Sequence, residues 1–158
     1  MIDRPFHLFV GTAFFLFLCG CGAMPSPTAA SKAAKDPVSE FKPIVEKFIP
    51  AFNDLYKEAE GKLATVKSVS VTPSSAKFDV KKTDSVVSPY TGELHATGIL
   101  TKEVVGACLG TYTFLFAFQD GKWIPQGGSF SGKTVHGTPV KNNFTPDAMT
   151  LALTKADL

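Results

Sequence analysis

The stretch that decides the fold is Tyr112–Trp123, with the sequence YTFLFAFQDGKW. Aromatic residues alternate with Thr, Leu and Ala over its first seven positions, which is the period of a half-buried β-strand. Asp120-Gly121 then favours a two-residue turn with positive φ, so the chain is predicted to fold back as a hairpin. In that hairpin Trp123 lies beside Phe118, on the aromatic face that forms the core.

The neighbouring segments extend this sheet. Residues 76–80 and 94–100 also alternate with a period of two. We predict an antiparallel pairing around a loose turn at Gly106, in which Leu94, Ala96, Gly98 and Leu100 face Phe118, Phe116, Phe114 and Tyr112 in that order. After the Asp-Gly hairpin, Gly127-Gly128 predicts a β-bulge, because without one Phe130 would point away from the aromatic face.

A helix is predicted before the strands, from Val38 to Leu63. Apolar residues recur there at steps of three and four, and charged residues occupy the other side. Ser39 is the expected N-cap, and Gly61 is typical of a C-terminal stop. At the other end of the chain, Thr145-Pro146 resembles a helix start, although Met149, Leu151 and Leu153 alternate as a strand would; we predict a short helix.

These elements predict an α+β fold: a long N-terminal amphipathic helix on a curved antiparallel sheet of four to five strands, with a short C-terminal helix. Over residues 38–135 this layout is similar in outline to the cystatin-like and NTF2-like folds. The similarity is architectural, so it implies a shape and no particular activity.

The N-terminus resembles the export signal of bacterial lipoproteins. Leu8–Leu18 is an apolar stretch shorter than the roughly 20 residues of a membrane-spanning helix, and small residues follow it. Leu18-Cys19-Gly20-Cys21 resembles the lipobox, in which cleavage falls between Gly20 and Cys21 and the Cys21 thiol receives a diacylglyceryl group. The alternative is an ordinary secretory signal cut near Ala23.

The predicted domain organisation follows from this resemblance: residues 1–20 are the signal peptide, 21–37 the lipidated cysteine and a tether, and 38–158 one globular domain. The tether is small and polar and contains proline, so it cannot bury enough surface to fold. The resemblance implies a cell-envelope protein held on the extracytoplasmic side of a membrane, with the outer membrane favoured because Gly22 is no strong retention signal.

The composition of the chain limits the classes of partner and cofactor that we expect it to bind. The formal net charge is +2, and Arg4, the only arginine, lies in the predicted signal peptide. Arginine is the usual residue for bidentate recognition of phosphate and of guanine edges, so we expect no nucleic-acid partner. With Cys21 lipidated, Cys108 is the one thiol of the domain, and no zinc-like spacing is present, so we expect no disulfide, metal or cofactor.

Two motifs invite a catalytic interpretation. Gly127, Gly132, Lys133 and Thr134 fit the phosphate-loop pattern, but Pro125 precedes them and Pro139 follows, so no helix can start there and we interpret the match as chance. A Cys108–His95 dyad is excluded by the predicted register, which separates the two residues by about 30 Å along the strands, so Cys108 is expected to be buried.

A low-priority candidate site remains in residues 79–93 and just beyond. It is a predicted polar patch on the side opposite the aromatic face, near the Ser88-Pro89 turn, made of Asp84, Ser85, Tyr90, Glu93 and His95. The sequence therefore favours a non-catalytic binding or structural lipoprotein whose partner is an envelope protein or small ligand. The alternatives are a small exported hydrolase with a pocket between helix and sheet, and a cystatin-like peptidase inhibitor with a wedge at Asp120-Gly121 and Trp123.

Overall fold

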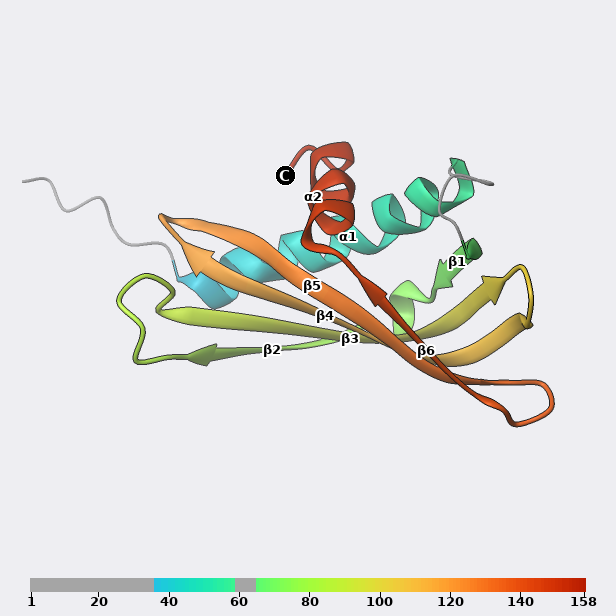
Figure 1. Ribbon diagram of the computed structural model, residues 1–158. Helices are drawn as coiled ribbons and strands as arrows, with labels where there is room; N and C mark the ends of the chain where they lie inside the picture. Colours follow the sequence, from blue (N-terminus) through green and yellow to red (C-terminus); the bar gives the residue numbers. More distant parts are fainter. Residues whose placement is uncertain (1–35, 59–64) are drawn as a thin grey trace, which may run out of the picture. The chain divides into compact units, whose positions relative to one another are not determined.

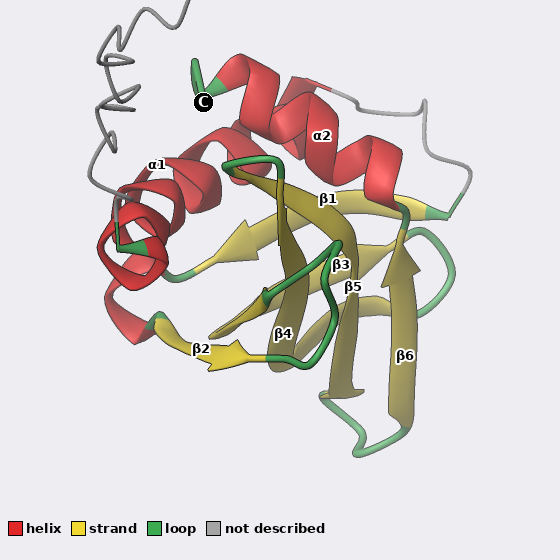
Figure 2. Ribbon diagram, turned by 90° about the vertical axis from the view of Figure 1, so that its left-hand side faces the viewer, coloured by secondary structure: helices red, strands yellow, loops and turns green. Residues whose placement is uncertain are grey.

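Six antiparallel strands form one sheet, and two helices cover one of its faces (Figures 1 and 2). The computed structural model describes residues 36–58 and 65–158, which belong to one unit, Ala34–Leu158. The elements in chain order are α1 (Pro37–Glu58), β1 (Val66–Val71), a 3₁₀ turn (Pro73–Ser75), β2 (Lys77–Lys82), β3 (Tyr90–Lys102), β4 (Gly106–Gln119), β5 (Lys122–Thr134), β6 (Pro139–Phe144) and α2 (Pro146–Lys155). Neither of these two helices is long and apolar enough to span a bilayer.

The predicted signal peptide, the lipobox with Gly20 and Cys21, and most of the tether lie outside the described residues, and these predictions remain predictions. The described chain begins at Asp36, which caps α1. Its carboxylate oxygens accept hydrogen bonds from the backbone N–H groups of Val38 (3.2 Å) and Ser39 (3.3 Å). The cap is therefore Asp36 and not Ser39, whose hydroxyl instead donates to the Asp36 carbonyl. An aspartate at this position also suits the positive end of the helix dipole.

The apolar stripe of α1 packs on the aromatic face of the sheet. Phe41, Phe48 and Phe52 are fully buried. Phe48 and Phe52 meet the ring of Phe114 edge-on, with centroids 5.0 and 4.9 Å apart, and Phe41 meets Phe116 at 5.2 Å. Edge-to-face pairs at these separations add to the stabilisation that burial alone provides. The space between α1 and the sheet is thus filled with rings.

The predicted architecture of a long helix on four to five strands is wrong. The sheet has six strands in the order β1-β3-β4-β5-β6, with β2 paired beside β1 on the same edge of β3. The described helix ends at Glu58, before the predicted end at Leu63, and residues 59–64 are outside the described part. The short C-terminal helix is present as α2, and Thr145 caps it by accepting from the Ala148 N–H at 3.3 Å.

The two strands that the sequence pattern failed to predict are β1 and β6. In β1 a bulge between Val66 and Ser68 breaks the alternation, so that the buried residues Val66, Val69 and Val71 are spaced unevenly. Asparagines in β6 lower its β-propensity. A tertiary contact secures β1: the Asn53 side chain of α1 accepts from the Val71 N–H at 2.7 Å and donates to the Val71 C=O at 2.8 Å.

The Asp-Gly hairpin is confirmed. Asp120 and Gly121 have φ values of 50° and 76°, and Phe118 pairs with Trp123. The predicted bulge is also present, since Leu115 pairs with Gly127 but Phe116 pairs with Pro125. This places Phe130 in the core, where it is 1% exposed.

The predicted register between β3 and β4 is wrong by four residues. Leu94 pairs with Phe114 and Leu100 with Cys108, because both strands continue to a tight turn in which Gly106 has a φ of 72°. The predicted loose turn would have left these strands shorter. The shift is even, so the aromatic side chains stay on the predicted face, but Gly98 now lies opposite Gly110 and not opposite Phe114.

The corrected register creates a row of glycines across three strands, because Gly98 pairs with Gly110 and Gly110 with Gly132. An added Cβ on Gly110 would lie 2.3 Å from the Ser131 carbonyl oxygen and 2.7 Å from the Phe130 ring. Glycine is needed here because no side chain fits between the strands.

The burial of two tyrosines, Tyr56 and Tyr112, predicts that the protein loses stability at alkaline pH. Burial raises the pKa of Tyr56 from 10.0 to about 12. Burial raises that of Tyr112 further, and the charges of Tyr56 and Cys108 add to the effect. Because burial raises the folded-state pKa values, the contribution of these two tyrosines to the free energy of unfolding is complete below the unfolded-state pKa of about 10. It declines as the pH rises from there toward the folded-state pKa values.

The free energy of unfolding should therefore fall by roughly 1.4 kcal/mol per pH unit for each tyrosine above about pH 10. Urea titrations at a series of alkaline pH values measure this slope. Tyr112→Phe should remove one tyrosine's share of it, although its lost hydrogen bond to the Ile99 carbonyl (2.9 Å) lowers the stability at neutral pH. An unchanged slope in Tyr112→Phe would contradict the assignment.

Candidate functional site: the open face of the sheet

The face of the sheet away from the helices is polar in its middle and apolar at one end. Hydroxyl side chains dominate the central rows, where Thr97, Thr111 and Ser131 stand in line across β3, β4 and β5. Toward the end of the sheet at the β3–β4 turn, Ile99 and Leu109 replace them in the next row.

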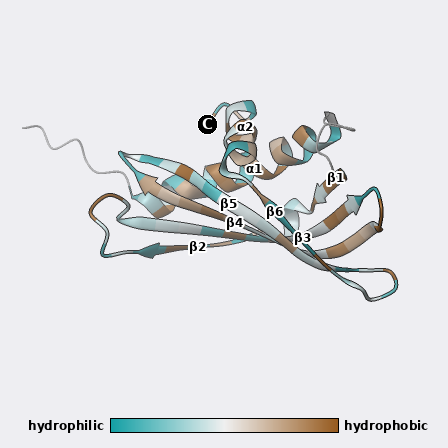
Figure 3. Cartoon of the chain, in the orientation of Figure 1, coloured by the Kyte–Doolittle hydropathy of each residue, from teal (hydrophilic) through white to brown (hydrophobic). Residues whose placement is uncertain are grey.

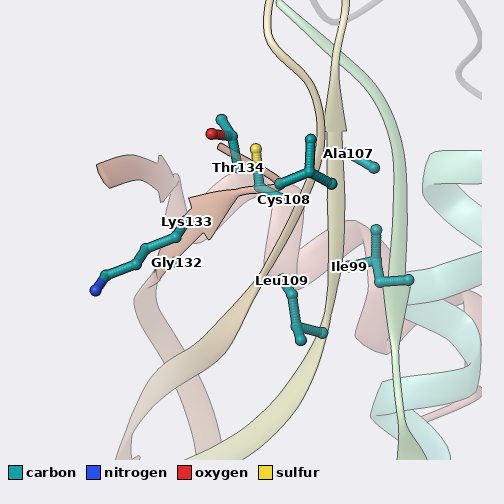
Figure 4. A pocket seen from close by; sticks show the side chains of 8 residues that line it. Ile99, Ala107, Cys108, Leu109, Gly132, Lys133 and Thr134 are labelled. Atoms are coloured by element: carbon teal, nitrogen blue, oxygen red, sulfur yellow. The ribbon is translucent and has the colours of Figure 1, made fainter. Parts of the chain in front are cut away.

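A groove of about 580 Å³ lies at this apolar end (Figure 4). Its lining comes from β3, β4, β5 and the residue after β5: Ile99, Ala107, Cys108, Leu109, Gly132, Lys133, Thr134 and Val135. Leu109 is 70% exposed and Val135 is 84% exposed. With Ile99, which is 44% exposed, they give this groove an exposed apolar lining, so the groove is a candidate binding surface.

Cys108 lies beneath the surface of this groove and is not exposed in it. The side chain is fully buried, and its thiol contacts the Gly106 carbonyl oxygen at 3.6 Å. The prediction of a buried cysteine is confirmed. His95 is on the other face of β3 and pairs with Thr113, which is five positions from Cys108 along β4, or about 17 Å. The predicted separation of about 30 Å was too large because of the register error, yet the two side chains still do not meet.

The predicted polar patch is only partly assembled. Glu93 and His95 are together on the open face, with the Glu93 Oε1 atom 3.1 Å from His95 Nε2. The other ring nitrogen lies 3.1 Å from the Thr113 hydroxyl. Tyr90 is on the opposite face, where its ring packs on Phe118 at 6.2 Å. The alternation along β3 requires this separation, since Tyr90 is an odd number of positions from the other two.

The last two members of the predicted patch, Asp84 and Ser85, lie in the loop between β2 and β3. Ser85 orders that loop by accepting a hydrogen bond from the Ser88 N–H at 3.1 Å. The segment with Gly127, Gly132, Lys133 and Thr134 is part of strand β5. It therefore opens no helix, which a phosphate loop requires.

A second groove, also of about 580 Å³, lies between the start of α1, the β4–β5 hairpin and α2. Trp123 lies at its base, 6% exposed, with its ring 4.5 Å from that of Phe41 and its indole N–H donating to the Pro37 carbonyl at 3.3 Å. This confirms Trp123 as a core residue and leaves it unsuited to a protruding inhibitory wedge. Neither His95 nor Asp84 lines this groove, so it lacks the residues that the hydrolase alternative needs.

Sequence reasoning missed the exposed apolar residues. Leu109 and Ile99 are on the open face because the strands alternate, but the register error hid their pairing. Val86 and Val87, in the β2–β3 loop, are 97% and 72% exposed. The signal was available in the sequence, since two adjacent valines sit between Ser85 and Ser88 in a turn-like segment where burial is not expected.

Within residues 36–58 and 65–158, no group of three or more His, Cys, Asp or Glu side chains is arranged to hold a metal ion. Comparison of the chain with protein-family models, curated proteins and solved structures finds no significant match.

Proposed function

We propose that this chain is a cell-envelope lipoprotein, anchored to a membrane through Cys21, whose folded domain is a non-catalytic binding or structural module. The observation that carries the proposal is the segment Leu18-Cys19-Gly20-Cys21, which follows an apolar stretch of signal-peptide length and precedes a polar tether. The tether leads into α1 at Asp36. The partner is an envelope protein or a small ligand.

Three features of the domain support a binding role over a catalytic one. The only described thiol, that of Cys108, is buried. The Glu93–His95 pair stands on an open sheet face with the His95 side chain 46% exposed, so water competes there with any substrate. The exposed side chains of Leu109 and Val135 provide apolar surface that a partner would cover.

The lipid on Cys21 would supply the attachment to the membrane. A single acyl chain gives only reversible binding, whereas two or more chains anchor a protein stably at about 0.8 kcal/mol per buried CH₂. The lipoprotein resemblance implies a diacylglyceryl group on the thiol and a further acyl chain on the α-amino group. Removal of this one sulfur atom should therefore abolish the attachment.

Cys21→Ala is expected to move the protein from the membrane fraction to the soluble extracytoplasmic fraction, with its fold unchanged. The reason is that no thiol remains at the lipobox position. Ultracentrifugation of cell lysates, with circular dichroism of the released protein, measures both properties. Cys19→Ala is the matched control, because it keeps the lipobox and should stay with membranes. Sedimentation of Cys21→Ala with membranes, or release of Cys19→Ala, would contradict the proposal.

A further inference from the structure

The loop between β2 and β3, residues 83–89, holds two valines in solvent. Val86 is 97% exposed and Val87 is 72% exposed. Figure 3 shows the tip of this loop as a hydrophobic segment at the end of an otherwise mixed hairpin. These two side chains bury little surface against the fold and are therefore available for a contact outside the described domain.

The exposure of the valines is built into the loop. The Thr83 N–H donates to the Pro89 carbonyl at 2.9 Å and closes the base of the loop. The Ser88 N–H donates to the Ser85 hydroxyl at 3.1 Å, and the Gln119 side-chain amide donates to the Ser88 hydroxyl at 2.7 Å. These bonds hold the loop closed at its base, while Val86 and Val87 at its tip remain exposed.

The same end of the domain receives the tether. The Gln119–Ser88 bond ties the loop to the β4–β5 hairpin, and the Trp123–Pro37 bond ties the start of α1 to that hairpin. Figure 1 shows the start of α1, the β2–β3 loop and the β4–β5 turn at one end of the sheet, and Figure 2 views the domain from this end. The chain therefore enters the domain beside the valine loop.

We propose that Val86 and Val87 insert into the lipid bilayer that holds the Cys21 anchor, so that the domain docks on the membrane by this loop. This inference rests on the proposed function and adds a contact to it. Fourteen residues, 22–35, separate Cys21 from Asp36, and an unfolded chain of that length has a mean reach of roughly 20 Å, so the predicted tether would keep this end of the domain near the lipid surface. The far turn, at Val104, lies a further 43 Å or so away along β3.

Tethering makes a weak contact sufficient. Once Cys21 is in the bilayer, insertion of the loop is an intramolecular event at a millimolar effective concentration. Two valines alone would not recruit a free protein, but they can orient an anchored one. The charges at this end are balanced, since Lys82 and Lys122 are accompanied by Asp84 and Asp120, all of them exposed. The contact should therefore form on zwitterionic lipid and persist in high salt.

The docked orientation leaves the groove at Leu109 and Val135 facing away from the membrane. The groove lies at the end of the sheet with the β3–β4 turn, opposite the end that receives the tether. A partner arriving from the aqueous side would then find it open. The β2–β3 loop would then contact the lipid, while the groove would remain available to a partner.

The test uses the full lipidated chain, purified from membranes and reconstituted in phosphatidylcholine vesicles. An environment-sensitive fluorophore is attached at Asp84→Cys, next to the valines, or at Glu103→Cys, an exposed acidic residue in the far turn, as the matched control. Labelling is selective, because Cys108 is buried and the Cys21 sulfur carries lipid. Quenchers attached to the lipid acyl chains report contact with the bilayer, and flotation of the vesicles reports the anchor.

We expect the probe at residue 84 to be quenched at least about threefold more strongly than the probe at residue 103, in low and in high salt. Val86→Ser/Val87→Ser should lower quenching at residue 84 to the level of the control, whereas Val104→Ser/Val105→Ser should leave it unchanged. Equal quenching of the two probes on vesicles that carry the protein would overturn the docking inference and leave the lipid anchor standing. A protein that does not float with vesicles would overturn both.

Discussion

Phe52→Ala is expected to lower the free energy of unfolding by about 3–5 kcal/mol, because it removes a ring from the centre of the core. Phe52 is fully buried and packs edge-on against Phe114 at 4.9 Å and Phe144 at 5.3 Å. It is also stacked on Phe48 at 5.4 Å. Rings on all sides come from α1 and two strands, so the cavity cannot close without moving a whole element.

Urea denaturation of purified protein measures this loss. Phe78→Ala is the matched control: the same substitution on the edge strand β2, at a side chain that is 37% exposed and contacts Phe41 at 5.6 Å. It should cost less than half as much, since water already reaches part of the ring. Equal losses for the two variants would show that Phe52 is not the core residue that its contacts indicate.

Gly110→Ala is expected to destabilise the protein by about 2–3 kcal/mol or more, although the same change elsewhere often stabilises. The substitution normally restricts the unfolded chain, which favours folding. Here the new Cβ would lie 2.3 Å from the Ser131 carbonyl oxygen and 2.5 Å from the Gly132 Cα, both of them backbone atoms that cannot rotate away. The strands β4 and β5 must separate to admit it, and the clash outweighs the gain in the unfolded state.

Thermal and urea unfolding of Gly110→Ala measure the loss. Thr111→Ala, at the neighbouring exposed position, controls for a change in strand propensity and should stay within about 0.5 kcal/mol of the parent. A neutral or stabilising Gly110→Ala would mean that β4 and β5 are not as close at the glycine row as the structure has them.

Local chemistry explains which parts of the fold were predictable. The turn at Asp120-Gly121 depends only on the backbone preferences of these two residues, so the hairpin and the Phe118–Trp123 pair were predicted correctly. The bulge near Gly127 followed from the need to bury Phe130. Thr145 before Pro146 marked the start of α2 in the same local way.

The failures were in features that tertiary contacts decide. Strand β1 is held by the two bonds from Asn53, which nothing in its own residues announces. The register of β3 on β4 depended on the length of one turn, and Gly106 was assigned to a loose turn where it forms a tight one. Because of that error, His95 was assigned a partner other than Thr113, and the row of paired glycines was not predicted.

The candidate sites show the same division. The lipobox at Cys21 depends only on the order of adjacent residues; it lies outside the described residues and stays a prediction. The polar patch failed because Tyr90 faces the core while Glu93 and His95 face outward, a difference that the strand period alone could have shown. The exposed valines of the β2–β3 loop could have been found from the sequence, but their place at the same end of the domain as the start of α1 comes from the fold.

The central claim is that the Cys21 sulfur becomes the lipid anchor of the domain. Intact-mass and peptide mass spectrometry of the protein extracted from its native membranes tests it most directly. The account predicts a mature chain whose first residue is Cys21, with a diacylglyceryl group on the sulfur and an acyl chain on the α-amino nitrogen. A free thiol at residue 21, or a chain that still begins at Met1, would contradict it.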